Sequence, residues 1–355
     1  MKKKYYAGLD IHKKTITICM KDKEGNIVQQ STIKSRPQSI ADWAVKAPKP
    51  FSVLMEATLF TGWIYDEFKK YSKDVRAGNP AQMNYIAKSK HKDDRLDAEK
   101  LADLLRVDMV PEVTVLPPEV RKVRNLLRYR NWLVKETTRF KNKISNQLIS
   151  HGIEYDENRL HRKRYFSELV GGLNGNHDLM QILKMSRSQL EMLITFERES
   201  RKLIYGHPGI GERVDMLMTI PGVGEITALT WALEVWEPGR FTANGAISYC
   251  GLCQGRNSSA GVEKSGPISK MRNKRLQWVL IEAAKGAVFK KKNRRLTEIY
   301  DSVKSSMHHN AATIAVARQM VKWLLAVDKR GTEFIDYENV SPADEKIPIT
   351  AEAGA

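Results

Sequence analysis

The first 80 residues restrict the fold of this chain most strongly, because strand patterns come first and then alternate with helix patterns. The segments YYAGLDI, TITICM and IVQQSTI predict three strands, and the turn residues DKEGN separate the second from the third. Helix patterns at Gln38–Ala47 and Trp63–Tyr71 alternate with strand patterns at Phe51–Ala57 and near Val75–Ala77. Three hairpin-connected strands followed by alternating helix and strand predict an α/β domain with a mixed sheet.

The pattern changes after residue 114, and the chain of 355 residues is long enough for several domains. From Glu119 to Ile149 there is neither proline nor glycine, and Leu126, Leu133 and Phe140 stand seven residues apart. This spacing predicts a long amphipathic helix that, with a second helix at Leu179–Ile204, forms a coiled-coil arm. We therefore expect an α/β domain over 1–114, the arm over 115–209, a mostly helical domain over 210–330 and a disordered tail over 331–355.

The positive charge of the chain is concentrated in two segments. The formal net charge is +18; residues 115–170 hold 13 Lys+Arg against 6 Asp+Glu, and residues 256–295 hold 12 against 2. A uniformly basic solvated surface is the alternative, but it fits this uneven distribution less well. Two basic segments separated by balanced ones favour surfaces that bind a polyanion, above all the phosphate backbone of nucleic acid.

Neither a membrane segment nor a signal peptide is expected. No run of eighteen apolar residues occurs, and the basic N-terminus leads into strand-like alternation. The three cysteines, Cys19, Cys250 and Cys253, are too few for a disulfide framework and suit a reducing compartment. We expect a cytoplasmic, nucleoid-associated protein without a membrane partner.

Acidic residues are placed where they could meet at one edge of the predicted sheet. Asp10 and Glu56 each end an apolar strand, and Asp93, Asp94 and Asp97 begin a helix. At 3.6 residues per turn, Asp94 and Asp97 lie toward the apolar stripe of that helix, whereas Asp93 turns away. An alternative is that the helix dipole alone favours each of these three carboxylates.

Four carboxylates that converge on one sheet edge would repel one another, and a divalent cation is the usual resolution. Hard oxygen ligands favour Mg²⁺ or Mn²⁺, and such ions stabilise the attacking and leaving oxygens of a phosphodiester. The residues alone therefore predict a metal-dependent nuclease or strand transferase.

Two later segments also indicate nucleic-acid chemistry. LMTIPGVGEITALTWALEV, Leu217–Val235, resembles a helix-hairpin-helix whose turn amides can hold a phosphate, although a glycine-rich helix connection without a ligand is equally compatible. Ser248–Leu280 predicts a flexible loop that leads into the most basic segment. Its Cys250-Gly-Leu-Cys253 pair lacks the further ligands of a zinc site. Its serines are either loop residues or a nucleophile beside the cations Arg256, Lys264, Lys270 and Arg272.

Several separated motifs together resemble one family. GLD, MEATLFTG, KDDRLDAEKLA, IPGVGEITA, YCGLCQG and SSAGVEKSGPISKMRNKRLQWVLIEAA occur in this order over about residues 5–330. They are similar to motifs of the insertion-sequence transposases of the IS110 type, which include the Piv-like DNA invertases. The order and spacing of these motifs carry the resemblance, because each is weak alone.

The resemblance implies a fold and a set of catalytic residues. The family has a RuvC-like (RNase H fold) domain with an Asp-Glu-Asp-Asp metal site, a coiled-coil arm and a transposase domain with a nucleophilic serine. By motif, the acids are Asp10, Glu56, Asp94 and Asp97. The serine lies eleven residues before the lysine of the ISK motif, which here gives Ser259.

The sequence departs from the family pattern near these residues. Ala260 stands where glycine usually follows the serine, Gln254 stands where proline is frequent, and Asp93 replaces a common threonine. Ser258 adjoins Ser259, so the choice between them stays open. None of these departures removes a proposed catalytic group.

The resemblance also implies partners and a reaction. Family members are recombinases guided by a bridge RNA, and they assemble as homo-oligomers, dimers or tetramers, on target and donor DNA. We therefore expect a metal-dependent (Mg²⁺ or Mn²⁺) DNA transposase that forms a phosphoserine intermediate. Alternatives are a junction-resolving nuclease without that intermediate and a nucleic-acid-binding protein without catalysis. The expected nucleic-acid contacts are Arg256, Lys264, Lys270, Arg272, Lys274, Arg275, Arg128, Arg139 and Lys143.

Overall fold

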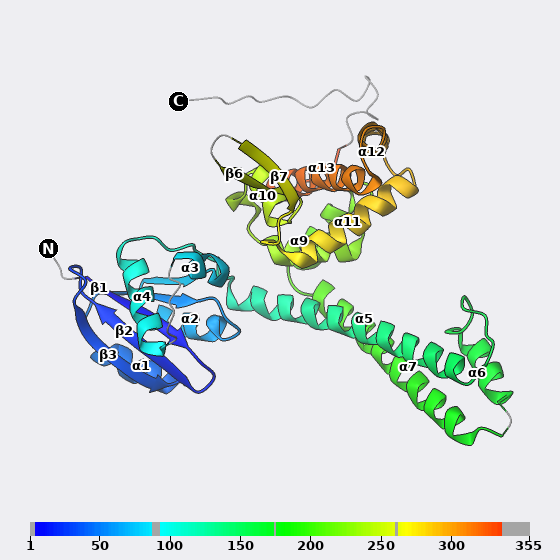
Figure 1. Ribbon diagram of the computed structural model, residues 1–355, viewed down its shortest axis with the longest axis horizontal. Helices are drawn as coiled ribbons and strands as arrows, with labels where there is room; N and C mark the ends of the chain where they lie inside the picture. Colours follow the sequence, from blue (N-terminus) through cyan, green and yellow to red (C-terminus); the bar gives the residue numbers. More distant parts are fainter. Residues whose placement is uncertain (1–3, 87–92, 174, 260–261, 336–355) are drawn as a thin grey trace. The chain divides into compact units, whose positions relative to one another are not determined.

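The computed structural model describes residues 4–86, 93–173, 175–259 and 262–335, and for 84–86, 256–259, 262–265 and 267 it describes the backbone alone. The chain divides into two compact units, one within residues 1–122 and one within 123–355 (Figure 1).

The first unit is built on a five-stranded sheet with the order β3-β2-β1-β4-β5. The antiparallel strands are β1 (Tyr5–Ile11), β2 (Thr15–Lys21) and β3 (Ile27–Lys34). Strands β4 (Phe51–Glu56) and β5 (Asp74–Gly78) extend the sheet parallel to β1. The predicted mixed sheet is confirmed, and its strands lie where the apolar runs and the alternating pattern predict them.

Helices cover both faces of this sheet. Helices α1 (Pro37–Lys46) and α2 (Thr61–Lys69) enclose the larger apolar core, in which the rings of Trp43 and Phe68 meet edge to face. The second core contains side chains of α3 (Pro80–Ile86) and α4 (Asp94–Arg106) together with Leu54 of β4. The β-branched and aromatic residues that predict the strands are therefore buried under helices on both faces of the sheet.

The packing of α4 on the sheet is unusually close at Gly8 of β1. A Cβ added to Gly8 would collide with the backbone of Ala98 and lie 2.8 Å from Cβ of Leu101. Further along, the buried Lys21 of β2 holds Glu99 at 2.9 Å and Asp103 at 2.6 Å. Steric fit and these ion pairs fix both the height and the rotation of α4 on the sheet.

The second unit contains an arm made of two long helices. Helix α5 (Pro118–Ser150) enters it from residue 123 onward, α6 (Lys163–Gly171) follows, and α7 (His177–Tyr205) runs back beside α5 (Figure 1). Ile144 and Leu148 of α5 pack with Leu183 and Leu190 of α7 in one apolar cluster. Arg130 Nε donates to Glu197 Oε1 over 2.6 Å and links the two helices. The predicted helices are confirmed, and the coiled-coil character of the arm stays a prediction.

The rest of the second unit is mostly helical, as predicted. Its helices are α8 (Ile210–Met218), α9 (Glu225–Val235), α10 (Ala243–Tyr249), α11 (Lys274–Phe289), α12 (Arg294–Lys304), α13 (His309–Arg330) and the short η1 (Pro238–Arg240). Helix α9 lies in the centre, with Trp231 fully buried. Asp328 of α13 accepts hydrogen bonds from Arg213 at 2.7 Å and from Trp231 Nε1 at 2.8 Å.

One expectation for this region is wrong. Ser248–Leu280 was expected to contain a flexible loop, but β6 (Gln254–Ser259) and β7 (Val262–Ile268) form an antiparallel hairpin. The residues QGRNSS and VEKSGPI have low strand propensity, so the pattern hid the strands. Backbone pairing from Gln254–Ile268 to Ser259–Val262 supplies hydrogen bonds that side-chain composition does not reveal.

A disordered tail was expected over 331–355, and residues 336–355 of it lie outside the described residues. Residues 331–335 are described, and the ring of Phe334 packs on Trp323 with centroids 4.8 Å apart.

Within the described part of the chain, every helix is too short or too polar to cross a bilayer.

Candidate functional site

Asp10 and Glu56 lie side by side at one edge of the sheet. Leu9 of β1 is in register with Met55 of β4, so Asp10 and Glu56 are the next residues of two adjacent strands. Side chains alternate along a strand, and Gly8 and Leu54, two residues earlier, both face α4. Asp10 and Glu56 therefore lie on the face of the sheet that α4 covers.

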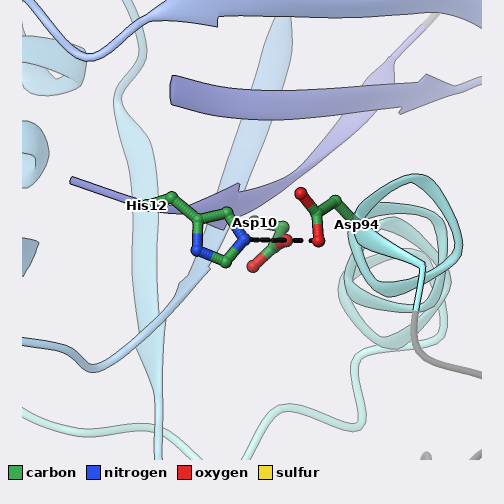
Figure 2. A group of neighbouring side chains, drawn as sticks. All are labelled: Asp10, His12 and Asp94. Carbon is green, nitrogen blue, oxygen red and sulfur yellow. Dashed lines mark hydrogen bonds and ion pairs between the residues drawn. The ribbon is translucent and has the colours of Figure 1, made fainter. Parts of the chain in front are cut away.

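The N-terminus of α4 brings a third acid to this edge. Asp93 is the N-cap residue, and its side chain accepts a hydrogen bond from the Arg95 amide at 2.9 Å. Asp94 is the first helical residue and lies beside Asp10 (Figure 2). The sequence pattern predicts that Asp94 faces the sheet and that Asp93 turns away. This geometry agrees, because Asp93 caps the helix and Asp94 faces the sheet edge.

His12 joins Asp10 and Asp94. Its Nε2 lies 3.1 Å from Oδ2 of Asp10 and 3.3 Å from Oδ1 of Asp94, and Figure 2 shows the ring directed toward both carboxylates. One ligand atom from each of the three residues falls within 4.8 Å of the others. Sequence reasoning missed His12. Its position two residues after Asp10, immediately after the end of the same strand, was the available signal, because residues i and i+2 of an extended chain share a face.

The positive charge near Asp10 is too small to offset the effects of burial and of the neighbouring acids on its carboxylate. Burial raises its pKa above the ordinary 3.8, and the neighbouring Asp94 and Asp97 raise it further. His12 acts in the opposite direction, through its charge and its hydrogen bond. Burial and like charge both disfavour the ionised form, so a cation beside Asp10 would be strongly favoured.

The other two predicted acids lie near the group of three. Asp97 is one turn beyond Asp94, is close enough to raise the pKa of Asp10, and accepts from Lys100 Nζ at 3.0 Å. Glu56 neighbours Asp10 through the strand register. Among the described residues, the set of ligand atoms within 4.8 Å contains Asp10, His12 and Asp94. Asp97 and Glu56 adjoin that set without belonging to it.

The donor set suits a divalent cation. Carboxylate oxygens from two elements and one imidazole nitrogen converge, with Asp10 and His12 partly buried and Asp94 exposed. Mg²⁺ and Mn²⁺ both accept carboxylates, and the imidazole is a donor that Mn²⁺ tolerates more readily. The group therefore fits a divalent metal site at the end of the central strand.

The predicted nucleic-acid contacts of the arm have different surroundings. Arg128 forms hydrogen bonds of 3.1 and 3.2 Å with Glu234, which is 2% exposed and also accepts from Asn273. Arg139 is paired with Glu136 at 2.6 Å on the exposed surface. Lys143 is exposed on α5. The arrangement gives Arg128 a structural partner and leaves Lys143 facing solvent.

The C-terminal basic segment divides in the same way. Lys270, Lys274 and Arg275 are exposed, whereas Arg272 packs against Gly251 and donates from Nη1 to the Ser269 carbonyl at 2.8 Å. The side chains of Arg256, Lys264, Ser258 and Ser259 lie outside the described part of the chain. The backbone of Ser259 ends β6, opposite Val262.

The segment with a resemblance to a helix-hairpin-helix is a tight turn between α8 and α9. Gly222 has φ +85°, and a Cβ there would lie 2.5 Å from Cβ of Ala287. Both the backbone conformation and the close contact therefore require glycine. Gly224 is the N-cap of α9 and provides no side-chain cap.

Comparison with known protein families identifies the class of enzyme. A transposase family model of the IS110 DEDD type matches residues 7–152, which include the acidic site. A second model, described as transposase IS116/IS110/IS902 family, matches residues 214–301. The chain is therefore a DNA transposase.

Relatives place it within that class. The chain is 24% identical over 340 residues to the transposase for insertion sequence element IS1328 of Yersinia enterocolitica, an alignment that covers 92% of this chain and 97% of that protein. It is 26% identical over 299 residues to the transposase for insertion sequence element IS1111A of Coxiella burnetii, covering 81% and 79%. The protein belongs to the IS110 type of insertion-sequence transposases.

Proposed function

We propose that the first unit is a RuvC-like domain of the RNase H fold, and that Asp10, Glu56, Asp94 and Asp97 form its metal site. The observation that carries this proposal is the convergence of Asp10, His12 and Asp94 at the end of the central strand, beside Glu56. The strand order β3-β2-β1-β4-β5, with β3, β2 and β1 antiparallel and β4 and β5 parallel to β1, supports the fold assignment.

Mg²⁺, or Mn²⁺ in its place, is the cation that this proposal assigns to the site. When bound, it would neutralise charge on the phosphodiester oxygens during cleavage. The chain's own contribution is orientation: β1 and β4 hold Asp10 and Glu56 in register, and α4 holds Asp94 and Asp97 one turn apart. Since burial already penalises the charge on Asp10, the site is prepared for a cation before DNA arrives.

Ser259 is the proposed nucleophile. Its Oγ would form a bond to phosphorus, its proton would pass to a base, and the bond to the leaving deoxyribose oxygen would break as that oxygen takes a proton. The phosphoserine link keeps the energy of the broken bond, so rejoining to a new strand needs no nucleotide cofactor. Arg256, Lys264 and Lys270 would balance the negative charge of the transition state.

Substitution of adjacent serines tests this assignment. We expect Ser259→Ala to abolish strand exchange and to remove the covalent protein–DNA species that denaturing electrophoresis traps with wild type. Ser258→Ala is the matched control and should retain both. Recombination by Ser259→Ala without a trapped species would instead support a junction-resolving nuclease that uses the metal site and water.

We further propose that a guide RNA and a homo-oligomer take part in DNA selection. The basic segments 115–170 and 256–295 support binding of more than one nucleic acid. Sequencing of RNA that copurifies with the full chain tests the first point, and light scattering on DNA tests the second. RNA guidance would be contradicted if the protein still selected its target DNA after treatment with ribonuclease.

A further inference from the structure

Two aromatic rings lie together on the exposed face of α5. Tyr129 is 47% exposed and Trp132 is 48% exposed, and their rings stack with centroids 5.5 Å apart at 28°. Single exposed aromatics are common, but an adjacent pair on a rigid helix is a surface that favours a partner. Large flat side chains also lose little entropy when they bind, because each has only two rotatable χ angles.

The charge around these rings indicates the chemistry of that partner. Helix α5 carries nine Lys+Arg and two Glu. At 3.6 residues per turn, Tyr129, Trp132, Arg139 and Lys143 fall within about 80° around the helix axis. Glu136 also lies on this face, and Arg139 neutralises it at 2.6 Å. The face thus combines aromatic rings with a net positive charge and complements a polyanion that has flat, apolar groups.

We propose that Tyr129 and Trp132 form a stacking platform for unpaired bases of single-stranded DNA, with Lys135 and Lys143 further along the helix near the phosphates. Both lysines are exposed. Trp132 and Lys143 are about 17 Å apart along the axis at 1.5 Å per residue, which is enough for a short run of nucleotides. Bases stack on aromatic side chains with little sequence preference, because every base has a π face.

The bases must be unpaired. In a duplex the faces of the bases are covered by their neighbours, and only edges are accessible in the grooves. The chain is a DNA transposase. This inference rests on the recombination proposed above, in which strand exchange separates paired strands before new pairs form. The platform would hold such a strand while it has no complement.

Substitutions that separate stacking from apolar contact test this proposal on the full chain. Trp132→Leu keeps an apolar side chain of high helix propensity but removes the π face. We expect it to weaken binding of labelled oligothymidine by about 5- to 100-fold, and to change binding of a duplex of equal length less than twofold. Trp132→Phe should retain most of the wild-type affinity. Phe196→Leu, on α7 and 41% exposed, is the matched control.

Several outcomes would overturn the platform. Trp132→Leu could bind oligothymidine as tightly as wild type, or lose as much affinity for duplex DNA as for oligothymidine. It could also lose more affinity for oligouridine than for oligothymidine. A change of self-association in sedimentation would assign the face to a second copy of the chain. Circular dichroism checks the helix, and Tyr129→Leu provides a second variant should Trp132→Leu misfold. Ser259→Ala should bind oligothymidine normally, so failure of the serine mechanism is distinguishable.

Discussion

Gly8 lies directly against the backbone of Ala98, so no side chain fits between β1 and α4 at that point. Asp10 is two residues beyond Gly8 on the strand, and Asp94 is one turn before Ala98 on the helix. The close approach of these two backbones therefore determines the distance between the two carboxylates.

We predict that Gly8→Ala impairs both stability and catalysis. Overpacking costs about 1–3 kcal/mol of unfolding free energy. A shift of α4 by about 1 Å would lower strand transfer by about 100-fold. Chemical denaturation and a strand-transfer assay measure the two effects. Gly171→Ala is the control, because nothing lies within 4 Å of its added Cβ and Ala favours the helix, so it should not lower the unfolding free energy. A fully active Gly8→Ala would contradict the role of this contact.

Asp93 and Asp94 are neighbours with different roles, and Asn substitutions distinguish them. Asp94→Asn removes a ligand charge, so we predict at least about a tenfold loss of Mn²⁺ affinity, measured by electron paramagnetic resonance. Asp93→Asn should bind Mn²⁺ like wild type, because Asn caps a helix as well as Asp does. Equal losses in the two variants would mean that charge density, and not the position of Asp94, creates the site.

The pKa of Asp10 predicts a pH-dependent stability. Its raised folded pKa, caused chiefly by burial, favours folding below the ordinary value of 3.8, and this contribution is lost as pH rises through the folded pKa. In chelator, Asp10→Asn should therefore melt above wild type at pH 7, with a difference that shrinks as pH falls toward 3.8. Added Mn²⁺ should stabilise wild type alone. A less stable Asp10→Asn protein in chelator at pH 7 would contradict this sign.

Arg128 and Lys143 were both expected to contact nucleic acid. Their different surroundings predict that substitution by Ala lowers stability at Arg128 and DNA binding at Lys143. Arg128→Ala leaves Glu234 buried without its charged partner, so we predict a loss of about 3 kcal/mol of unfolding free energy. Lys143→Ala should leave stability unchanged and weaken DNA binding with a reduced salt dependence. Thermal melting and binding titrations at two salt concentrations distinguish the pair. Unchanged stability of Arg128→Ala would mean that Glu234 finds another partner.

The sheet was predictable because its signals are local. β1 is a short apolar strand whose turn and neighbours follow in sequence, and the helical phase of Asp94 needs only 3.6 residues per turn. The carboxylates Asp10 and Glu56 were predictable from their positions at strand ends, since adjacent parallel strands end at one edge.

Other features depend on contacts that a local pattern does not contain. His12 gains its role only because α4 brings Asp94 to the other side of the ring. The partner of Arg128 lies 106 residues away in sequence, so basic composition alone assigned it to nucleic acid. The β6–β7 hairpin depends on backbone pairing between segments rich in glycine and serine, where strand propensity gives no signal.

The buried ion pair of Asp328 also indicates how far the reading frame must extend to encode the contacts of the second unit. A reading frame interrupted after Ile335 still encodes the carboxylate that Arg213 and Trp231 require, together with the Trp323–Phe334 ring contact. A frame interrupted before Asp328 leaves Arg213 as an uncompensated charge in an apolar interior. A stop codon placed a few codons earlier would thus remove the carboxylate that holds Arg213 and Trp231, and the second unit would lose a buried ion pair.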